Sequence, residues 1–451
     1  MPDLSKLIKA YDVRGVVPDE FNEDIARQIG AAFARLVDAG TVILVRDMRE
    51  SSVPLSTAFA QGVTSQGLDV IDAGLGSTDL LYFAAGSLNL PGAMFTASHN
   101  PAQYNGIKMC LAGAAPVGQD TGLGHIRRML EDGIPISTTT PGTTTSRDLL
   151  AEYATYLRSL VDLTGIRPLT VVADAGNGMG GHMVPAVLGD AILPALPLSI
   201  IPLYFELDGT FPNHEANPLE PANLVDLQKA VVAHGADIGL AFDGDADRCF
   251  VIDQNGDSVP PSTIVGLIAN QELTKQPGST VVYNAITSKA VPELVTEQGG
   301  VAVRERVGHS FMKATMARHD AIFGGEHSGH YYFRDFWRAD TGMLAAMHVL
   351  AALGDQARLL SELTNDYTRY HASGEINSEV ADIPYALDRV AEHFASTGKA
   401  DHLDGLTIDL PHGWFNLRPS NTEPLLRLNV EAASPADMIH IRDEVLALVR
   451  G

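Results

Sequence analysis

Three aspartates at alternate positions, Asp243, Asp245 and Asp247, form the sharpest chemical signal in the chain. On an extended backbone these side chains share one face, whereas on a helix they would spread over roughly 200°. Three carboxylates this close repel one another unless a cation lies among them, and oxygen ligands favour Mg²⁺ or Ca²⁺. A calcium EF-hand is excluded, because its sixth and twelfth positions would be Arg248 and Gln254 instead of Gly and Glu. The spacing predicts a divalent cation site, with a solvated acidic turn as the alternative.

Arg248 directly follows the third aspartate. A metal ion beside a guanidinium group is an arrangement that binds and polarises a phosphoryl group. The alternative is an internal salt bridge between Arg248 and one of the aspartates. Both interpretations stay open from the sequence.

A second loop, Thr96–Pro101, contains a serine that could act as a nucleophile. This residue is Ser98, and His99 and Lys108 are near enough in sequence to assist it. The alternative is an ordinary turn, because Ser, Asn and Pro are common turn residues. No Gly-x-Ser-x-Gly motif surrounds Ser98, so a hydrolase elbow gains no support.

Two further loops carry hydrogen-bonding groups. In Gly325–His330, side chains such as Glu326 and Ser328 could bind sugar hydroxyls or transfer protons, although a capped helix start fits equally well. In Arg418–Pro424, an arginine is followed by hydroxyl and amide donors within a Pro-bounded turn. That composition favours a phosphate-binding loop over a polar surface turn.

Gly176–Gly181 matches the Gly-x-Gly-x-x-Gly pattern of dinucleotide-binding loops. The acidic residue expected about 20 positions later is missing, because Asp190 comes too early and Glu206 rather late. We therefore predict a tight strand-to-helix turn here and no nucleotide site.

Short apolar runs alternating with helical stretches must position these loops, and they suggest three related α/β domains built from parallel βαβ units. Each domain offers a loop at the carboxyl end of a strand, where open sheets bind ligands. After about residue 367 the pattern predicts a smaller antiparallel α+β domain, and the polar stretch Ser137–Ser146 predicts an exposed connection. The expected strands are Thr41–Val45, Gly92–Phe95, Leu169–Ala173, Asp237–Phe242, Ser279–Tyr283, Ala321–Phe323, Leu406–Leu410, Trp414–Arg418 and Leu425–Glu431.

The composition restricts the possible partners. The chain has 451 residues and a net charge of −24, which argues against nucleic acid and against an anionic membrane surface. Its two cysteines exclude a disulfide scaffold, and the N-terminus shows no targeting segment, so we expect a cytoplasmic protein. The longest apolar stretch, residues 184–205, contains Asp190 and four prolines, which makes a membrane helix an unsuitable interpretation.

Taken together and in this order, the loops resemble those of the α-D-phosphohexomutase family. The resemblance spans nearly the whole chain. Its motifs are Tyr11–Gly15, Thr96–Pro101, Asp208–His214, Asp243–Arg248, Val307–Ser310, Gly325–His330 and Arg418–Pro424. It implies three related α/β domains, residues 1–147, 148–255 and 256–366, and a C-terminal α+β domain, residues 367–451, around a central cleft.

The same resemblance implies a mechanism, in which Ser98 is a phosphoserine. It implies one Mg²⁺ per subunit, held by Asp243, Asp245, Asp247 and a phosphoserine oxygen. The phosphoryl group would pass to a hexose phosphate to form a 1,6-bisphosphate, which reorients and returns its other phosphate to Ser98. Glucose or mannose 1,6-bisphosphate would be the activator, and the enzyme would be a monomer or a homodimer.

The resemblance also implies which residues surround the substrate. The phosphate that does not react would be bound by Arg418, Ser420, Asn421 and Thr422. Further phosphate contacts or proton transfer would come from Tyr11, Arg14, Lys108, Arg248 and Arg427. His309 and His330 match family positions near the sugar, and His330 is the candidate general base. His99, next to Ser98, is a further catalytic candidate.

Sugar selection would lie in the loop that contains Glu326 and Ser328, which would bind the 3- and 4-hydroxyls common to glucose and mannose. Between them, relatives that act on mannose and glucose usually have Met, glucosamine-specific relatives have Gln, and this chain has His327. The segment Tyr331–Phe336 resembles bacterial phosphomannomutases. We therefore expect mannose and glucose phosphates as substrates. The alternatives are glucosamine phosphate, a non-catalytic sugar-phosphate sensor and, least favoured, a nucleotide-dependent oxidoreductase.

Overall fold

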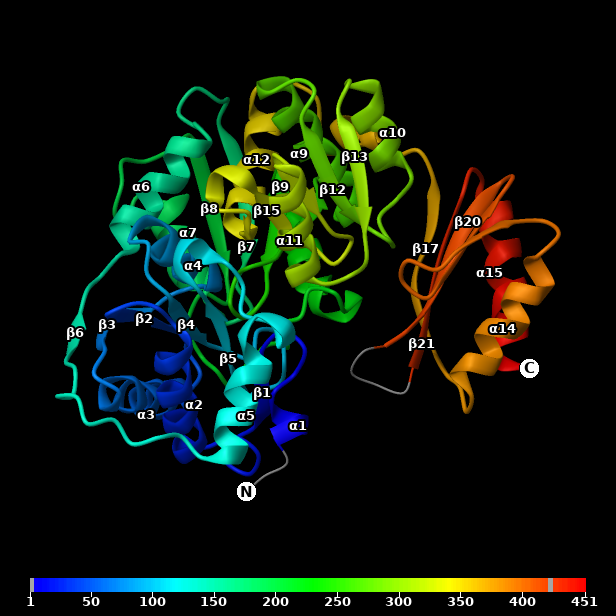
Figure 1. Cartoon of the computed structure of the whole chain (residues 1–451). Coiled ribbons are helices and arrows are strands. Elements are labelled where there is room, and N and C mark those ends of the chain that lie inside the picture. The colour runs from blue at the N-terminus through cyan, green and yellow to red at the C-terminus, as the bar shows by residue number, and fades with distance from the viewer. Residues whose placement is uncertain (1–3, 421–424) are drawn as a thin grey trace. The chain divides into compact units, whose positions relative to one another are not determined.

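The computed structural model describes residues 4–420 and 425–451. The chain forms two compact units, one comprising Met1–Pro261 with Ser328–Leu363 and the other Ser262–His327 with Thr364–Gly451. Figure 1 traces the elements along the chain. Within the described residues, no helix combines the length and the apolar character needed to cross a membrane.

The first unit begins with a six-stranded sheet in the order β1-β5-β4-β2-β3-β6. Strand β2 is a run of buried aliphatic residues that pairs in parallel with β3 and β4, and β5 pairs antiparallel with both β4 and β1. Helices α2 and α3 lie side by side against this sheet (Figure 1), and Phe33, Phe59 and Phe95 meet in the core between them. The strands are β1 (Val13–Val16), β2 (Thr41–Arg46), β3 (Asp69–Leu75), β4 (Gly92–Phe95), β5 (Tyr104–Cys110) and β6 (Thr144–Ser146). The helices are α1 (Leu4–Leu7), α2 (Glu23–Leu36), α3 (Ser52–Ser65), α4 (Thr78–Ser87) and α5 (Gly124–Asp132).

The first unit continues with a five-stranded sheet in the order β11-β10-β9-β7-β8. Strand β7 is parallel to both β8 and β9, and β10 runs antiparallel to β9. The strands are β7 (Leu169–Asp174), β8 (Leu198–Leu203), β9 (Ile238–Phe242), β10 (Cys249–Asp253) and β11 (Ser258–Val259). The helices are α6 (Leu150–Leu160), α7 (Gly180–Val187) and α8 (Val225–His234). The unit also contains the antiparallel pair β15 (Tyr331–Phe333) and β16 (Ala339–Asp340), followed by α12 (Gly342–Gly354) and α13 (Leu360–Thr364).

In the second unit, strand β12 lies between β13 and β14 and is parallel to both. The strands here are β12 (Thr280–Asn284), β13 (Val301–Glu305) and β14 (Phe323–Gly325), and the helices are α9 (Pro261–Lys275), α10 (Ala290–Glu297) and α11 (His309–His319). The same strand pattern occurs around β2, around β7 and around β12. This repetition confirms the prediction of three related α/β regions.

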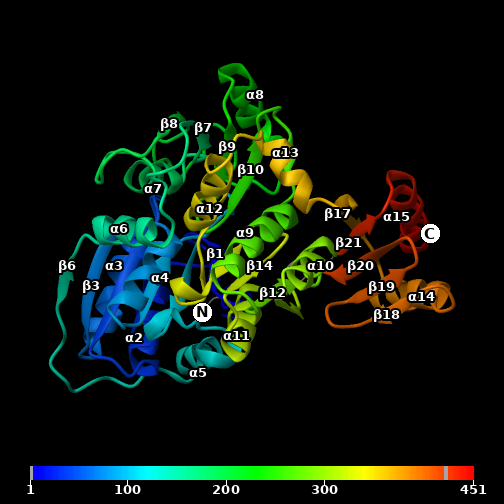
Figure 2. The ribbon, with the colours of Figure 1, turned by 90° about the horizontal axis from the view of Figure 1, so that it is seen from above.

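The second unit ends in a five-stranded antiparallel sheet in the order β17-β21-β20-β19-β18. Figure 2 shows two helices, α14 (Ile383–Phe394) and α15 (Pro435–Arg450), on the same face of this sheet. Val390, Phe415 and Val445 share the core between the sheet and these helices. The strands are β17 (His371–Glu379), β18 (Lys399–Asp401), β19 (Leu406–Leu410), β20 (Gly413–Pro419) and β21 (Leu425–Ala432). The expected C-terminal α+β region is confirmed.

Two local expectations need correction. The strand expected at Ala321–Phe323 is observed as Phe323–Gly325, so it ends directly before Glu326. The stretch Ser137–Ser146 is exposed as expected, but its last three residues form the edge strand β6, which is parallel to β3. The physical reason is the same in both cases, because a neighbouring strand offers backbone hydrogen bonds that can bring glycines, or an exposed polar segment with no apolar pattern, into a sheet.

Candidate functional site

The serine loop leaves the carboxyl end of β4 and turns sharply at Ser98, whose backbone has the left-handed φ of 51°. This conformation is uncommon for a residue with a side chain. The backbone N–H of Ser98 donates to Oγ1 of Thr96 at 2.8 Å, and the Ser98 side chain is almost fully buried. The turn therefore holds the hydroxyl in one orientation.

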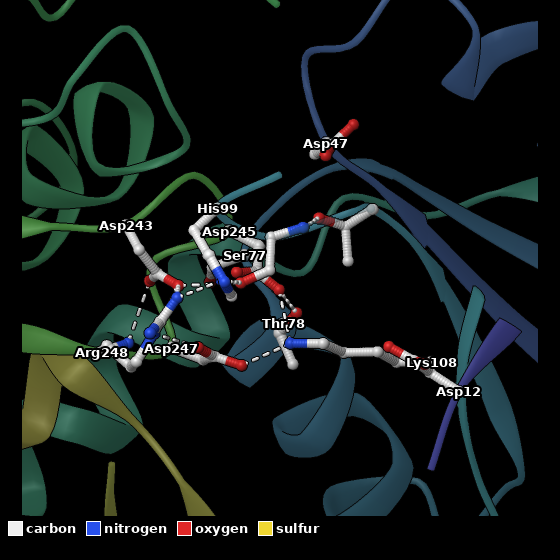
Figure 3. Close-up of polar contacts among 12 residues, drawn as sticks. Asp12, Asp47, Ser77, Thr78, His99, Lys108, Asp243, Asp245, Asp247 and Arg248 are labelled. Carbon is white, nitrogen blue, oxygen red and sulfur yellow. Dashed lines mark hydrogen bonds and ion pairs between the residues drawn. The ribbon is translucent and has the colours of Figure 1, made fainter. Parts of the chain in front are cut away.

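The aspartate loop occupies the equivalent place after β9. Asp243, Asp245 and Asp247 are all buried, and each offers an oxygen within 4.8 Å of the others. Ala246 has a left-handed φ of 57°, which turns the loop between the second and third aspartates. Figure 3 shows the three carboxylates gathered beside His99 and Lys108. The predicted clustering of the three side chains is thus observed, and their burial disagrees with a solvated acidic turn.

The two loops meet through hydrogen bonds to Asp243. Oγ of Ser98 donates to Oδ2 of Asp243 at 2.9 Å, and Nε of Arg248 donates to the same oxygen at 2.8 Å. A second nitrogen of Arg248 donates to Nδ1 of His99. Burial and the positive charge of Arg248 lower the pKa of His99 well below 6.5, so the imidazole is neutral. Arg248 therefore forms the salt bridge that the sequence left open, and it also contacts the serine loop.

Lys108, on β5, reaches the other two aspartates. Its Nζ lies 2.7 Å from Oδ2 of Asp245 and 2.5 Å from Oδ2 of Asp247. Burial opposes the charge of Lys108, but these two carboxylates outweigh it and raise the lysine pKa. Figure 3 shows Lys108 and Arg248 approaching the carboxylates from opposite sides.

The protonation states of the aspartates differ. Burial raises the pKa of Asp243 to about 7, although the Arg248 charge acts against this shift. Burial also opposes the ionisation of Asp245 and Asp247, yet Lys108 holds the pKa of both below 3.8. Two of the three carboxylates are therefore ionised well below neutral pH.

The donor set fits a hard divalent cation. Oδ1 of Asp245 and Oδ1 of Asp247 are buried, and neither has a hydrogen-bond partner among the described residues. A buried carboxylate oxygen without a partner is costly, and a cation would satisfy it. Oxygen-only ligands suit Mg²⁺ or Ca²⁺ better than softer transition metals.

His330 lies beside this cluster in the first unit. Its Nε2 is 3.7 Å from Oδ1 of Asp247 and 3.9 Å from Oδ2 of Asp340, and its Nδ1 is 3.2 Å from Oγ of Ser328. The ring also stacks on Tyr332. The imidazole is partly exposed, so a bound molecule could reach it.

Two N-terminal residues of the predicted site belong to the same unit. Arg14 lies in β1, and its guanidinium donates to Oδ1 of Asn100 at 2.6 Å and pairs with Asp12 at 2.5 Å. Tyr11 lies three positions before Arg14 and is partly buried. Arg14 is therefore attached to the serine loop.

The second unit contains the remaining predicted sugar-binding residues that the structure describes. Glu326 is buried after β14 and accepts a 2.9 Å hydrogen bond from the amide of Asn284. Nδ1 of His327 lies 2.8 Å from Oγ of Ser262. His309 begins helix α11.

The predicted phosphate loop follows β20. Arg418 and Arg427 are register partners on β20 and β21, and the carboxylate of Glu375 lies 3.0 Å from the first and 3.2 Å from the second. The backbone N–H of Ser420 donates to the carbonyl of Leu425 at 2.8 Å, so these two residues lie next to each other. Asn421 and Thr422 lie outside the described residues. Two adjacent guanidinium groups are of the kind that binds anions, and here both of them pair with the one carboxylate of Glu375.

The sequence interpretation missed three residues that support the site. Asp47 and Arg49 follow β2 directly, and Arg49 is buried against the serine loop. Thr78, at the start of α4, donates to Oδ2 of Asp245 at 2.5 Å. The sequence could have pointed to Asp47 and Arg49, because they follow a predicted strand and loops at the carboxyl ends of parallel strands gather at one edge of a sheet.

Comparison with domain families gives four consecutive matches. These are the three α/β/α domains I, II and III and the C-terminal domain of phosphoglucomutase/phosphomannomutase, which match residues 5–133, 151–256, 260–370 and 375–448. A phosphomannomutase of Salmonella typhimurium is 41% identical over 445 residues, with 97% of each chain covered. A protein described as "Phosphohexose mutases" from Xanthomonas campestris pv. campestris is 42% identical, covering 98% of this chain and 99% of its own.

Among solved structures, a phosphoglucomutase/phosphomannomutase family protein from Burkholderia thailandensis superposes on the whole chain. The TM-score is 0.89 at 31% sequence identity, with 100% of this chain and 98% of that chain covered. The sequence and structural matches both extend over the full set of loops described above.

Proposed function

The chain belongs to the phosphoglucomutase/phosphomannomutase family, and we propose that it interconverts hexose 1-phosphates and hexose 6-phosphates through a phosphoserine at Ser98. It is an isomerase, and its full-length relatives at about 40% identity include phosphomannomutases. The carrying observation is the hydrogen bond from Ser98 to Asp243, which joins a buried nucleophile to a buried three-aspartate cluster.

We propose that the family's metal requirement is met by one Mg²⁺ held by Asp243, Asp245, Asp247 and an oxygen of the Ser98 phosphate. The buried Oδ1 atoms of Asp245 and Asp247, which accept no hydrogen bond from any residue that the structure describes, support this assignment. When bound, the ion supplies positive charge to the oxygens of the phosphoserine. Glucose or mannose 1,6-bisphosphate is the proposed activator, because a bisphosphate can phosphorylate Ser98.

The chain's own residues have separate roles in the proposed reaction. The P–Oγ bond at Ser98 breaks while a sugar hydroxyl forms a new P–O bond. The hydroxyl proton passes to Nε2 of His330, and the Oγ released at Ser98 takes up one proton from solvent to become a hydroxyl again. Lys108 and Arg248 bind oxygens of the transferring phosphoryl group, and neutral His99 orients Ser98. The reverse sequence, with the bisphosphate turned around, returns a phosphate to Ser98. The proximity of His330 to Asp247 supports its role as the base.

The second phosphate and the sugar are assigned to other loops. Arg418, Arg427 and Ser420 are proposed to bind the phosphate that does not react, an assignment supported by the two adjacent guanidinium groups. Glu326 and Ser328 are proposed to bind the 3- and 4-hydroxyls, which mannose and glucose share. Mannose and glucose differ at the 2-hydroxyl, and neither of these contacts involves that group. Both sugars are therefore expected as substrates. Asn421, Thr422, His309, Tyr11 and Arg14 are proposed to complete the substrate-binding set.

We also propose that the four functional loops belong to four domains, residues 1–147, 148–255, 256–366 and 367–451. The four consecutive family matches support this division.

The test is a set of initial rates on mannose 1-phosphate, glucose 1-phosphate and glucosamine 1-phosphate, with Mg²⁺ and trace glucose 1,6-bisphosphate. Comparable rates on the first two sugars are expected, and a strong preference for the amino sugar would contradict the proposed specificity. A second arm incubates wild type and Ser98→Ala with [³²P]glucose 1,6-bisphosphate. Stoichiometric label on the wild type and none on the variant is expected, and wild-type turnover in Ser98→Ala would contradict the phosphoserine mechanism.

A further inference from the structure

Arg49 is buried, with only 2% of its surface exposed, so its guanidinium group is not hydrated by solvent. All five N–H groups of a guanidinium are donors, and in Arg49 each has a partner. Nε donates to Oδ2 of Asp47 at 3.2 Å. The other four N–H groups donate at 2.7–3.0 Å to backbone carbonyls. Three of these carbonyls are in the serine loop, at Ser98, Asn100 and Pro101, and the fourth is that of Tyr104 at the start of β5.

The serine loop needs such a clamp because its conformation is strained. The left-handed φ of Ser98 is unfavourable for a residue with a side chain. Hydrogen bonds from a charged donor to several carbonyls of one loop favour this turn over its relaxed alternatives. A lysine could not replace the arginine, because it has three donors on a flexible stem and no planar fork.

The clamp is covered by Asp208–His214, a segment that belongs to the family resemblance and to which the proposed reaction assigns no role. Within this segment the ring of Phe211 lies 5.0 Å from the guanidinium carbon of Arg49. Gly209 lies so close that a Cβ on it would be 2.7 Å from Cα of Arg49. Asp208 accepts two hydrogen bonds from Thr210, at 2.8 and 2.6 Å, which closes the turn over the arginine.

We propose that Arg49, covered by Gly209 and Phe211, is the positioning residue that holds the Ser98 loop in the geometry required for phosphoryl transfer. Arg49 has no donor left for a substrate, so it acts only through the backbone of the loop. This inference rests on the proposed function. It assigns the Asp208–His214 turn a task, which is to exclude water from the arginine and to prevent its rotation.

The experiment compares wild type, Arg49→Lys and the matched control Arg46→Lys. Arg46 is the last residue of β2, the strand that Arg49 follows. It is partly exposed and forms a simple ion pair with Asp72 at 3.0 Å. In Arg49→Lys we expect kcat to fall about a hundredfold, because misplacing a reacting group by about 1 Å costs that much, with KM for mannose 1-phosphate changed less than about twofold. Arg46→Lys should retain both constants. Labelling of Ser98 by [³²P]glucose 1,6-bisphosphate should slow in parallel with kcat in Arg49→Lys.

If Arg49→Lys does not fold, a second variant tests the positioning role of Arg49. Gly209→Ala keeps the arginine but pushes on its backbone, and we expect kcat to fall about tenfold without a matching rise in KM. Unchanged kcat in either folded variant, or an effect on KM alone, would overturn the positioning role. Absence of mutase turnover in the wild type would instead overturn the proposed function, so the two failures are distinguishable.

Discussion

The hydroxyl of Ser98 donates a 2.9 Å hydrogen bond to Oδ2 of Asp243, a residue 145 positions later in the chain. The proposed nucleophile of one α/β region and the first proposed metal ligand of the next are therefore in direct contact. Adding a phosphoryl group to Ser98 would bring oxygens to the same carboxylate cluster. Because of this contact, the serine loop and the aspartate loop form one site.

Mg²⁺ affinity should fall as the pH decreases below neutrality. A carboxylate must lose its proton to bind a metal ion, and burial raises the pKa of Asp243 to about 7 in the free protein. Below that pH we expect the dissociation constant to rise about tenfold per pH unit, with uptake of Mg²⁺ releasing about one proton. Calorimetry in buffers of different ionisation enthalpy measures that release. An affinity that is constant from about pH 8 to about pH 6 would contradict the role of Asp243 as a ligand.

Replacing Lys108 with methionine should make stability dependent on the metal. Without the ammonium group, the buried carboxylates of Asp245 and Asp247 lose their counter-charge, which costs about 3–5 kcal/mol in EDTA. Mg²⁺ should restore a large part of this loss, because it supplies positive charge at the same oxygens. Denaturation in EDTA and in Mg²⁺ gives the comparison.

The control for this prediction is Lys229→Met, which removes an exposed helix pair with Asp226. Such a pair contributes less than about 1 kcal/mol with or without Mg²⁺. Equal destabilisation by the two substitutions would show that Lys108 does not neutralise the cluster.

Ionisation of Asp79 should lower the free energy of unfolding as the pH rises from about 4 to about 7. Burial raises its pKa from 3.8 to about 6, against the hydrogen bonds donated by Ser77, Thr341 and Tyr153. Since the native state binds more protons than the unfolded state in this window, the carboxyl group loses about 3 kcal/mol of relative stability there. The Asp79→Asn variant cannot ionise, so its stability relative to wild type should improve by about that amount across the window.

Asp69 is a control for Asp79, because its pKa is shifted in the opposite direction. Hydrogen bonds from Thr143 lower the pKa of Asp69, so its contribution to stability is present at neutral pH and is lost as the pH falls through that lowered pKa. Thermal midpoints of Asp79→Asn and Asp69→Asn, each measured against wild type at several pH values, should therefore diverge. Parallel behaviour of the two variants would contradict the assignment for Asp79.

His327→Met should leave sugar preference nearly unchanged. Its ring is held by Ser262, whose Oγ also accepts a 3.1 Å hydrogen bond from the backbone N–H of Ser288. The ratio of kcat/KM for mannose 1-phosphate and glucose 1-phosphate should stay within about threefold of wild type. In contrast, Glu326→Ala should lower kcat/KM for both sugars by about tenfold or more, because a charged hydrogen bond to a hydroxyl is lost. A tenfold change of the ratio in His327→Met would assign sugar selection to that residue.

Much of the secondary structure follows from local patterns. Gly92–Phe95 and Leu406–Leu410 are observed at the predicted bounds, because each is a short run whose side chains are mostly buried in a sheet. Gly176–Gly181 is the predicted turn between β7 and α7. The last strand of the third α/β region was placed two residues early, because Gly324 and Gly325 have low strand propensity and are held in β14 by pairing with β12.

By itself, the sequence determined the chemistry that is available: an acidic triplet that calls for a cation, a serine after a strand, and an arginine loop suited to phosphate. Residue types and their spacing carry that information, because charge and hydrogen-bonding capacity are properties of the side chains themselves. Only the tertiary structure decided that Arg248 bonds to Asp243, that Lys108 lies against Asp245, and that Arg49 donates to Asp47 and to backbone carbonyls of the serine loop. These contacts join residues that are mostly far apart in the chain, and they depend on strand register and on burial, which strengthens each electrostatic interaction by removing water.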